Sequence, residues 1–202
     1  MREKKIKDID FSRRAASYDS GLTGKGSQRF YNLLVREVEL QPKAVVLDVG
    51  CGTGTILKRL ADKSNIEGYG TDIAENMIIE AKKKCPQMDF TLASCDKLPF
   101  GDQTFDVVTA CMAYHHFSNQ EGFAKEAARV LKPGGVLYIA DPHFPWIVRK
   151  TLNGFFRLFR TAGAFHEPQE IDARFSEYGF TGTGAVVHGY AQVVKLRKGG
   201  SE

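Results

Sequence analysis

The stretch VLDVGCGTG, residues 46–54, decides the fold class of this 202-residue chain. Its first residues are apolar apart from Asp48 and are typical of a buried strand, and its three glycines predict a tight turn into a helix. A strand, a glycine-rich turn and a helix form the first unit of an α/β fold that binds a nucleoside ligand beside the helix N-terminus.

The glycine spacing and Asp48 narrow the class of ligand. The dinucleotide fingerprint GxGxxG binds a pyrophosphate, but here the third glycine comes one residue early. Asp48 stands two residues before Gly50, where a carboxylate repels a pyrophosphate and attracts an α-ammonium group. We expect the N–H groups of Gly50, Gly52 and Gly54 to face such a ligand. A glycine-rich turn without any ligand is the structural alternative.

Around this stretch, short apolar runs alternate with segments of helical periodicity. Buried strands separated by helices predict a parallel sheet covered on both faces. The expected strands are 44–49, 67–71, 88–93, 105–110 and 136–140, and the expected helices are 27–38, 55–63, 74–84, 120–131 and 168–178.

The end of the chain breaks this alternation. Two β-rich runs, 184–188 and 190–197, are separated only by Gly189, which leaves no room for a crossover helix, so they must pair as an antiparallel hairpin. We therefore predict one α/β domain, residues 27–202, with a doubly wound, mostly parallel sheet that ends in an antiparallel hairpin. Residues 1–26 are polar and aperiodic, and we expect a flexible arm or lid there.

The composition is that of an ordinary globular chain, with 43% hydrophobic and 26% charged residues and a net charge of +4. The four cysteines are scattered without a CxxC pair or a nearby histidine at ligand spacing, which predicts neither a metal site nor a disulfide framework. No apolar run reaches the length of a membrane span, and the expected location is the cytoplasm.

A second acid follows the second expected strand. Asp72 stands where a carboxylate accepts hydrogen bonds from both hydroxyls of a ribose, and Ile73 and Met77 would supply apolar contact. Asp72 would alternatively cap the helix that begins at Ala74, and the two roles are compatible. After the third strand, Asp96 is placed to accept a hydrogen bond from an exocyclic amine such as that of adenine, although a solvated loop acid is the plainer reading.

Five successive segments of the sequence resemble the motifs of a known protein family. VLDVGCGTG, GTDIAENM, ASCDKLPF, FDVVTACMAYHHF and RVLKPGGVLYIAD, within residues 44–141, resemble successive motifs of class I S-adenosylmethionine (SAM) dependent methyltransferases. Within this class, the segments resemble in particular the small-molecule (type 11) group, which includes quinone-biosynthesis methyltransferases. The resemblance implies a Rossmann-like seven-stranded sheet, SAM as methyl donor and S-adenosylhomocysteine as product.

The same resemblance implies roles for individual residues. Asp48 and the glycines hold the methionine part of SAM, Asp72 holds the ribose, Asp96 faces adenine, and Tyr18 belongs to an N-terminal lid. The full implied cofactor set is Tyr18, Asp48, Gly50, Cys51, Gly52, Asp72, Ile73, Met77, Cys95, Asp96 and Cys111.

His115 and His116 are the candidate catalytic residues. They follow the fourth strand, where a general base would stand near the methyl group, but a base is needed only if the acceptor must lose a proton. Adjacent residues do not point into one pocket, so at most one acts directly. Packed histidines bonded to backbone are the structural alternative.

Residues 142–166 contain no acidic side chain and form an unusual insert. Within 146–160, Val148, Leu152, Phe155 and Phe159 recur at helical spacing, with Arg149, Asn153, Arg157 and Arg160 on the opposite edge. Three interpretations compete: a cap over an apolar or aromatic acceptor, a helix resting on an anionic membrane, and a core-packing helix with a basic outer face.

The sequence favours methyl transfer to a small, apolar or aromatic acceptor. No NPPY-like segment follows the fourth strand, which argues against amino-methylation of nucleic acid. An RNA or protein methyltransferase and a non-catalytic SAM-binding protein remain as alternatives, and a nicotinamide oxidoreductase is disfavoured by Asp48. The sequence leaves the acceptor and the oligomeric state open.

Overall fold

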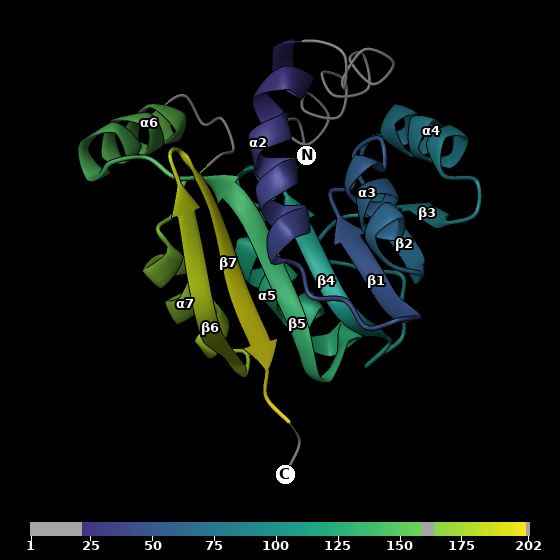
Figure 1. Ribbon diagram of the computed structural model, residues 1–202. Coiled ribbons are helices and arrows are strands. Elements are labelled where there is room, and N and C mark those ends of the chain that lie inside the picture. Colours follow the sequence, from purple (N-terminus) through teal and green to yellow (C-terminus); the bar gives the residue numbers. More distant parts are fainter. Residues whose placement is uncertain (1–21, 159–163, 201–202) are drawn as a thin grey trace.

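A seven-stranded sheet forms the centre of the computed structural model, which describes residues 22–158 and 164–200 (Figure 1). The strand order is β3-β2-β1-β4-β5-β7-β6, and only β7 runs against the others. This arrangement confirms the predicted doubly wound sheet with its terminal antiparallel hairpin. The strands are β1 Ala44–Val49, β2 Ile66–Asp72, β3 Asp89–Leu92, β4 Phe105–Cys111, β5 Leu131–Pro142, β6 Phe180–His188 and β7 Ala191–Lys198.

Helices cover both faces of the sheet. In Figure 1, α2 and α3 lie in front of the sheet, whereas α5 and α7 lie behind it. The described helices are α2 Leu22–Glu37, α3 Thr55–Lys63, α4 Glu75–Lys84, the 3-10 turn η2 Tyr114–His116, α5 Gln120–Val130, α6 Trp146–Leu158 and α7 Pro168–Ser176.

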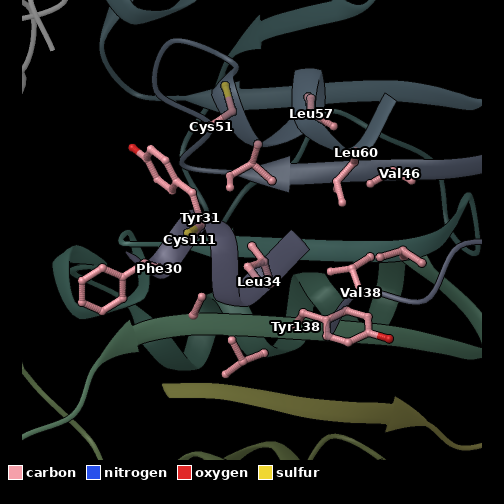
Figure 2. Packing of buried hydrophobic residues seen from close by; sticks show 14 of the residues in the cluster. Phe30, Tyr31, Leu34, Val38, Val46, Cys51, Leu57, Leu60, Cys111 and Tyr138 are labelled. Atoms are coloured by element: carbon pink, nitrogen blue, oxygen red, sulfur yellow. The ribbon is translucent and has the colours of Figure 1, made fainter. Parts of the chain in front are cut away.

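Alternation along β1 divides the core between the two faces. Val46 belongs to the cluster under α2 and α3, and its neighbour Leu47 belongs to the cluster under α5 and α7. Figure 2 shows Leu34 and Val38 of α2 packed toward the sheet beside Tyr138. Burial of apolar side chains on both faces stabilises the sheet and thereby fixes the positions of the strand ends.

Three elements differ most from the sequence expectations. Helix α2 begins at Leu22 rather than at residue 27, and residues 1–21 of the expected arm lie outside the described residues. Strand β5 spans Leu131–Pro142 rather than residues 136–140. Strand β6 begins at Phe180 rather than at residue 184. The hairpin turn is Gly189 and Tyr190, since His188 pairs with Ala191, and Gly189 has φ +63.

The helix of the insert does not match one of the three interpretations, a core-packing helix with a basic outer face. Arg149 is buried and forms ion pairs with Glu167 and Glu170, whereas Val148 and Phe155 are exposed. The reason is that Glu167, the N-cap of α7, and Glu170 in its first turn pair with Arg149 and turn this basic residue inward. Leu152 is half-buried, and Phe159 and Arg160 lie outside the described residues.

Candidate functional site

The glycine-rich turn lies at the carboxyl end of β1, between α3 and the segment that follows β4. Gly50, Gly52 and Gly54 all have positive φ angles of 75, 52 and 77°. A Cβ atom on Gly50 would lie 2.6 Å from the Cβ of Ala113, so glycine is needed for close approach as well as for the turn.

The backbone N–H groups of this turn are used within the protein, which corrects the expectation that they face a ligand. Those of Gly50 and Cys51 donate to the carbonyl oxygen of Thr71, at 2.7 and 2.9 Å. The Gly52 N–H donates to Asp72 Oδ2 at 2.9 Å, and the Gly54 N–H donates to the Cys51 carbonyl. These bonds fix the backbone path of the turn, and Gly50 and Gly52 line the cavity through that path.

Asp48 brings a buried carboxylate to the site. Its side chain is 1% exposed, and Oδ1 accepts a hydrogen bond from the Thr109 hydroxyl at 2.7 Å. Burial raises the pKa of Asp48 to about 7, the Thr109 hydrogen bond opposes this rise, and the charge of Asp72 adds to it. A cationic ligand group beside Asp48 would favour the charged carboxylate.

Asp72 stands at the end of β2 and fixes two neighbouring segments. Its Oδ2 accepts from Gly52, and its Oδ1 accepts from the N–H of Ala74 at 2.9 Å. The N-cap of α4 is Ala74, without a side-chain cap bond, so Asp72 fixes the turn before the helix and the expected capping role is wrong. Asp72 lines the same cavity as Asp48. Both carboxylates therefore border one cavity at the carboxyl ends of adjacent parallel strands, where open α/β sheets bind ligands.

The cavity has an empty volume of about 1170 Å³, part of it open to solvent. Nine predicted cofactor residues line it: Asp48, Gly50, Cys51, Gly52, Asp72, Ile73, Met77, Cys95 and Cys111. Burial raises the pKa of the Cys51 and Cys111 thiols well above the ordinary value. These thiols therefore remain protonated and form an apolar part of the cavity wall. Tyr18 lies outside the described residues.

Asp96 is directed elsewhere. Its carboxylate accepts hydrogen bonds from the Ser94 hydroxyl and from Asn119 Nδ2, and it is not among the described residues that line the cavity. The adjacent Ser94 and Cys95 do line it. The expected contact between Asp96 and adenine would require the carboxylate to leave Asn119.

Several wall residues escaped the sequence analysis, of which Tyr31 is the most informative. Tyr31 projects from α2 and is buried against the core beside Phe30 (Figure 2). An aromatic residue on the inner face of an amphipathic helix is indistinguishable by pattern from ordinary core, so no sequence signal marked it. The other unpredicted wall residues are Val49, Thr53, Thr55, Ile56, Ala93, Met112, Ala113, Phe117 and Ser118.

The two candidate histidines have different surroundings. His116 lines the cavity, whereas His115 is buried and is not among the described residues that line it. His115 Nδ1 lies 2.9 Å from Asp141 Oδ1, and its backbone N–H donates to Asp141 Oδ2 at 2.8 Å. Phe165 stacks on the His115 ring with centroids 5.1 Å apart. Asp141 at the end of β5 therefore fixes the orientation of His115.

Three aromatic side chains of the insert form a cluster that reaches His115 through Phe165. The Phe165 ring also lies 5.0 Å from Phe144 and 5.8 Å from Phe156 of α6, measured between centroids. In the described part of the chain, no group of three or more His, Cys, Asp or Glu side chains is arranged to hold a metal ion. Within the same ranges, no helix is both long and apolar enough to cross a membrane.

The residues around the cavity fit SAM. Asp48 offers a buried carboxylate to an ammonium group, and Asp72 offers two oxygens at the position for ribose. Ile73, Met77 and the protonated cysteines provide apolar contact for the remaining atoms. The same two carboxylates oppose a pyrophosphate.

Comparison with known proteins gives a consistent result. A family model described as a methyltransferase domain matches residues 47–139. A demethylmenaquinone methyltransferase of Chlorobaculum parvum is 36% identical over 110 residues, which cover 54% of this chain and 46% of that protein. The chain thus spans about half the length of this relative. An uncharacterized methyltransferase of Synechocystis is 30% identical over 161 residues, covering 77% of this chain and 76% of that protein.

The fold has solved counterparts as well. A methyltransferase in complex with the Trm112 activator of Haloferax volcanii superposes with a TM-score of 0.81 at 19% identity. The superposition covers 94% of this chain and 97% of that one. At this identity, the likeness concerns the fold alone.

Proposed function

This chain belongs to the methyltransferase-domain family, and we propose that it transfers a methyl group from SAM to a small apolar or aromatic acceptor. The observation that carries this proposal is the buried carboxylate of Asp48, which lines the cavity at the end of the central strand β1. A buried carboxylate is stabilised by a cation, and SAM carries an α-ammonium group on its methionine part.

Other residues of the cavity have distinct tasks in this proposal. Asp72 accepts hydrogen bonds from the ribose hydroxyls, and its existing bonds to Gly52 and Ala74 hold it in position for this. Ile73 and Met77 contact the base. Tyr31 closes the cavity from the side of α2.

Bound SAM supplies an electrophilic methyl group on a sulfonium. The protein's main contribution is to align the acceptor with that methyl group and to exclude water, because an in-line displacement with a good leaving group needs no covalent step. The proton of a hydroxyl or carbon acid acceptor must go to a base. We propose that His115 takes this proton from an acceptor held beside Phe165, which stacks on the His115 ring, and that Asp141 is the positioning residue.

The geometry of the pair supports this assignment. With its proton on Nδ1 directed to Asp141, the neutral imidazole of His115 keeps Nε2 as the accepting atom. His116 would then form cavity wall rather than act as the base.

The insert over residues 142–166 supports the choice of acceptor. Phe165 stacks on His115, and Phe144 and Phe156 pack against Phe165, which favours a cap over an apolar or aromatic molecule. The relative from Chlorobaculum parvum acts on demethylmenaquinone, which agrees with a small acceptor of this kind.

Calorimetric titration with SAM, with S-adenosylhomocysteine and with NAD tests the cofactor. We expect saturable binding of the first two only, and a roughly 10- to 100-fold weaker affinity for Asp48→Asn, because a charge-assisted contact is lost. Asp62→Asn is the matched control, since Asp62 is an exposed carboxylate on α3. Binding of NAD alone, or equal SAM affinity in both variants, would contradict the proposal.

Transfer of a labelled methyl group tests the acceptor. Small hydroquinones and phenols are compared with RNA and with protein extracts, and we expect incorporation into the small aromatic compounds. Incorporation only into a macromolecule would reassign the acceptor class.

A further inference from the structure

Helix α6 differs from the other helices in how it is attached to the domain. It makes no extensive contact with any described helix or strand, and in Figure 1 it projects beside the tip of the β6–β7 hairpin. Its inner face is held by Arg149, which pairs with Glu167 and Glu170, and by Asn153, which exchanges two hydrogen bonds with the backbone of Phe165 at 2.9 Å. The orientation of α6 is therefore fixed by polar tethers on one side.

The opposite side of α6 is apolar and exposed to solvent. Ile147 and Leu158 are 70% and 78% exposed and project in nearly the same direction, since they are eleven residues, or about three turns, apart. Phe155 and Val148 extend this apolar surface along one flank. Leaving four large apolar side chains in water on one helix face is unfavourable and marks a contact surface.

The other flank of this surface is basic. Lys150 and Arg157 are exposed there, and the Lys150 ammonium lies 4.5 Å from the centre of the Trp146 ring. No acidic residue occurs from Pro142 to His166, and the one buried cation of the helix, Arg149, is already neutralised from within. An apolar stripe bordered by cations and by a tryptophan matches an anionic lipid surface, whose acyl region takes the apolar side chains and whose headgroups take the cations.

From these observations, we propose that the outward face of α6, defined by Trp146, Ile147, Lys150, Phe155, Arg157 and Leu158, binds an anionic membrane surface. The contact brings the aromatic cap over His115 to the membrane, because Phe156 on the inner side of the same helix packs on Phe165. An apolar acceptor dissolved in the bilayer would thereby enter the site without crossing water. Lipid binding itself does not require methyl transfer, so it is testable independently of the proposed function.

The single tryptophan of the chain provides a built-in probe. The full chain is mixed with vesicles of phosphatidylcholine, with or without phosphatidylglycerol, and binding is followed by co-sedimentation and by Trp146 emission. We expect sedimentation and a blue shift with the anionic vesicles, both weakened by salt. The double variant Ile147→Glu/Leu158→Glu should bind about tenfold or more weakly, and Lys150→Glu/Arg157→Glu should lose the preference for phosphatidylglycerol.

Ile79→Glu is the matched control, because Ile79 is an exposed apolar residue, 43% accessible, on a different helix, α4. It should bind vesicles as the wild type does, and all variants should bind SAM equally. Absence of sedimentation and of any Trp146 shift for the wild type would overturn the proposal. So would a concentration-dependent self-association, abolished by Ile147→Glu/Leu158→Glu, in a protein that ignores vesicles, since the face would then pair two copies of the chain.

Discussion

At the scale of single residues, the proposed function gives binding and proton transfer to different groups. Asp48 and Asp72 border the cavity from adjacent strands, whereas His115 and Asp141 form a pair that is not among the described residues lining it. The sequence placed both histidines after β4 but could not choose between them, because the choice depends on the 3-10 turn and on Asp141, which is twenty-six residues away.

Exchanging the histidines singly should separate their roles. His115→Asn should lower kcat about 10²- to 10⁴-fold with an acceptor that loses a proton, and should leave SAM affinity and the KM for SAM unchanged. Asp141→Asn should give a smaller loss of kcat, again without a change of SAM affinity. His116→Asn should mainly weaken SAM binding, because its ring lines the cavity. An unchanged kcat for His115→Asn would mean that this residue only packs in the core.

At the scale of elements, the turn after β1 does more than its glycine pattern indicated. The pattern predicted a turn whose N–H groups are directed to a ligand. In the structure, several of these N–H groups donate hydrogen bonds to Thr71 and Asp72 instead. The turn instead fixes β1 to β2 and lets Ala113 approach Gly50. This approach joins the SAM side of the site to the segment that carries the histidines.

Two alanine substitutions should reveal the value of this contact. Gly134→Ala introduces a side chain at φ +77 with no heavy atom within 4 Å, and should cost about 1 kcal/mol of unfolding free energy from backbone strain alone. Gly50→Ala has a similar φ of +75 but meets Ala113, and should cost about 1 to 3 kcal/mol more. Urea denaturation measures both. Equal losses of unfolding free energy would mean that the segment after β4 shifts without cost to accommodate the added methyl group.

At the scale of the whole molecule, the buried Asp48 links stability to pH. Its pKa rises from 3.8 to about 7 on folding, chiefly because burial disfavours the charged form. The folded state thus holds this proton more tightly than the unfolded state. The stabilisation is fully present below the unfolded pKa and is lost as the pH rises through about 7.

This linkage predicts a comparison between wild type and Asp48→Asn, which keeps the shape and the Thr109 hydrogen bond without a titrating group. In the absence of SAM, the variant should gain stability relative to wild type as the pH increases from 4 to 8. Thermal denaturation at several pH values measures the difference, with about 2 to 4 °C expected for each kcal/mol. A difference independent of pH would show that Asp48 does not carry this proton.

The sequence by itself determined the layered α/β architecture and the positions of Asp48 and Asp72. Apolar runs indicate the strands and glycines indicate the turn, and an acid in the last residues of a parallel strand must lie at the carboxyl edge of the sheet. The short link at Gly189 likewise forced an antiparallel hairpin. These constraints depend only on nearby residues, so the sequence alone is enough to predict them.

Only the tertiary structure decided what each side chain faces. It turned Arg149 inward toward Glu167 and Glu170, exposed Ile147 and Leu158, drew Asp96 to Asn119, and brought Tyr31 of α2 to the cavity. The physical reason is that each of these orientations depends on a partner far away in the sequence, whose charge or hydrogen-bonding group becomes a neighbour only after folding.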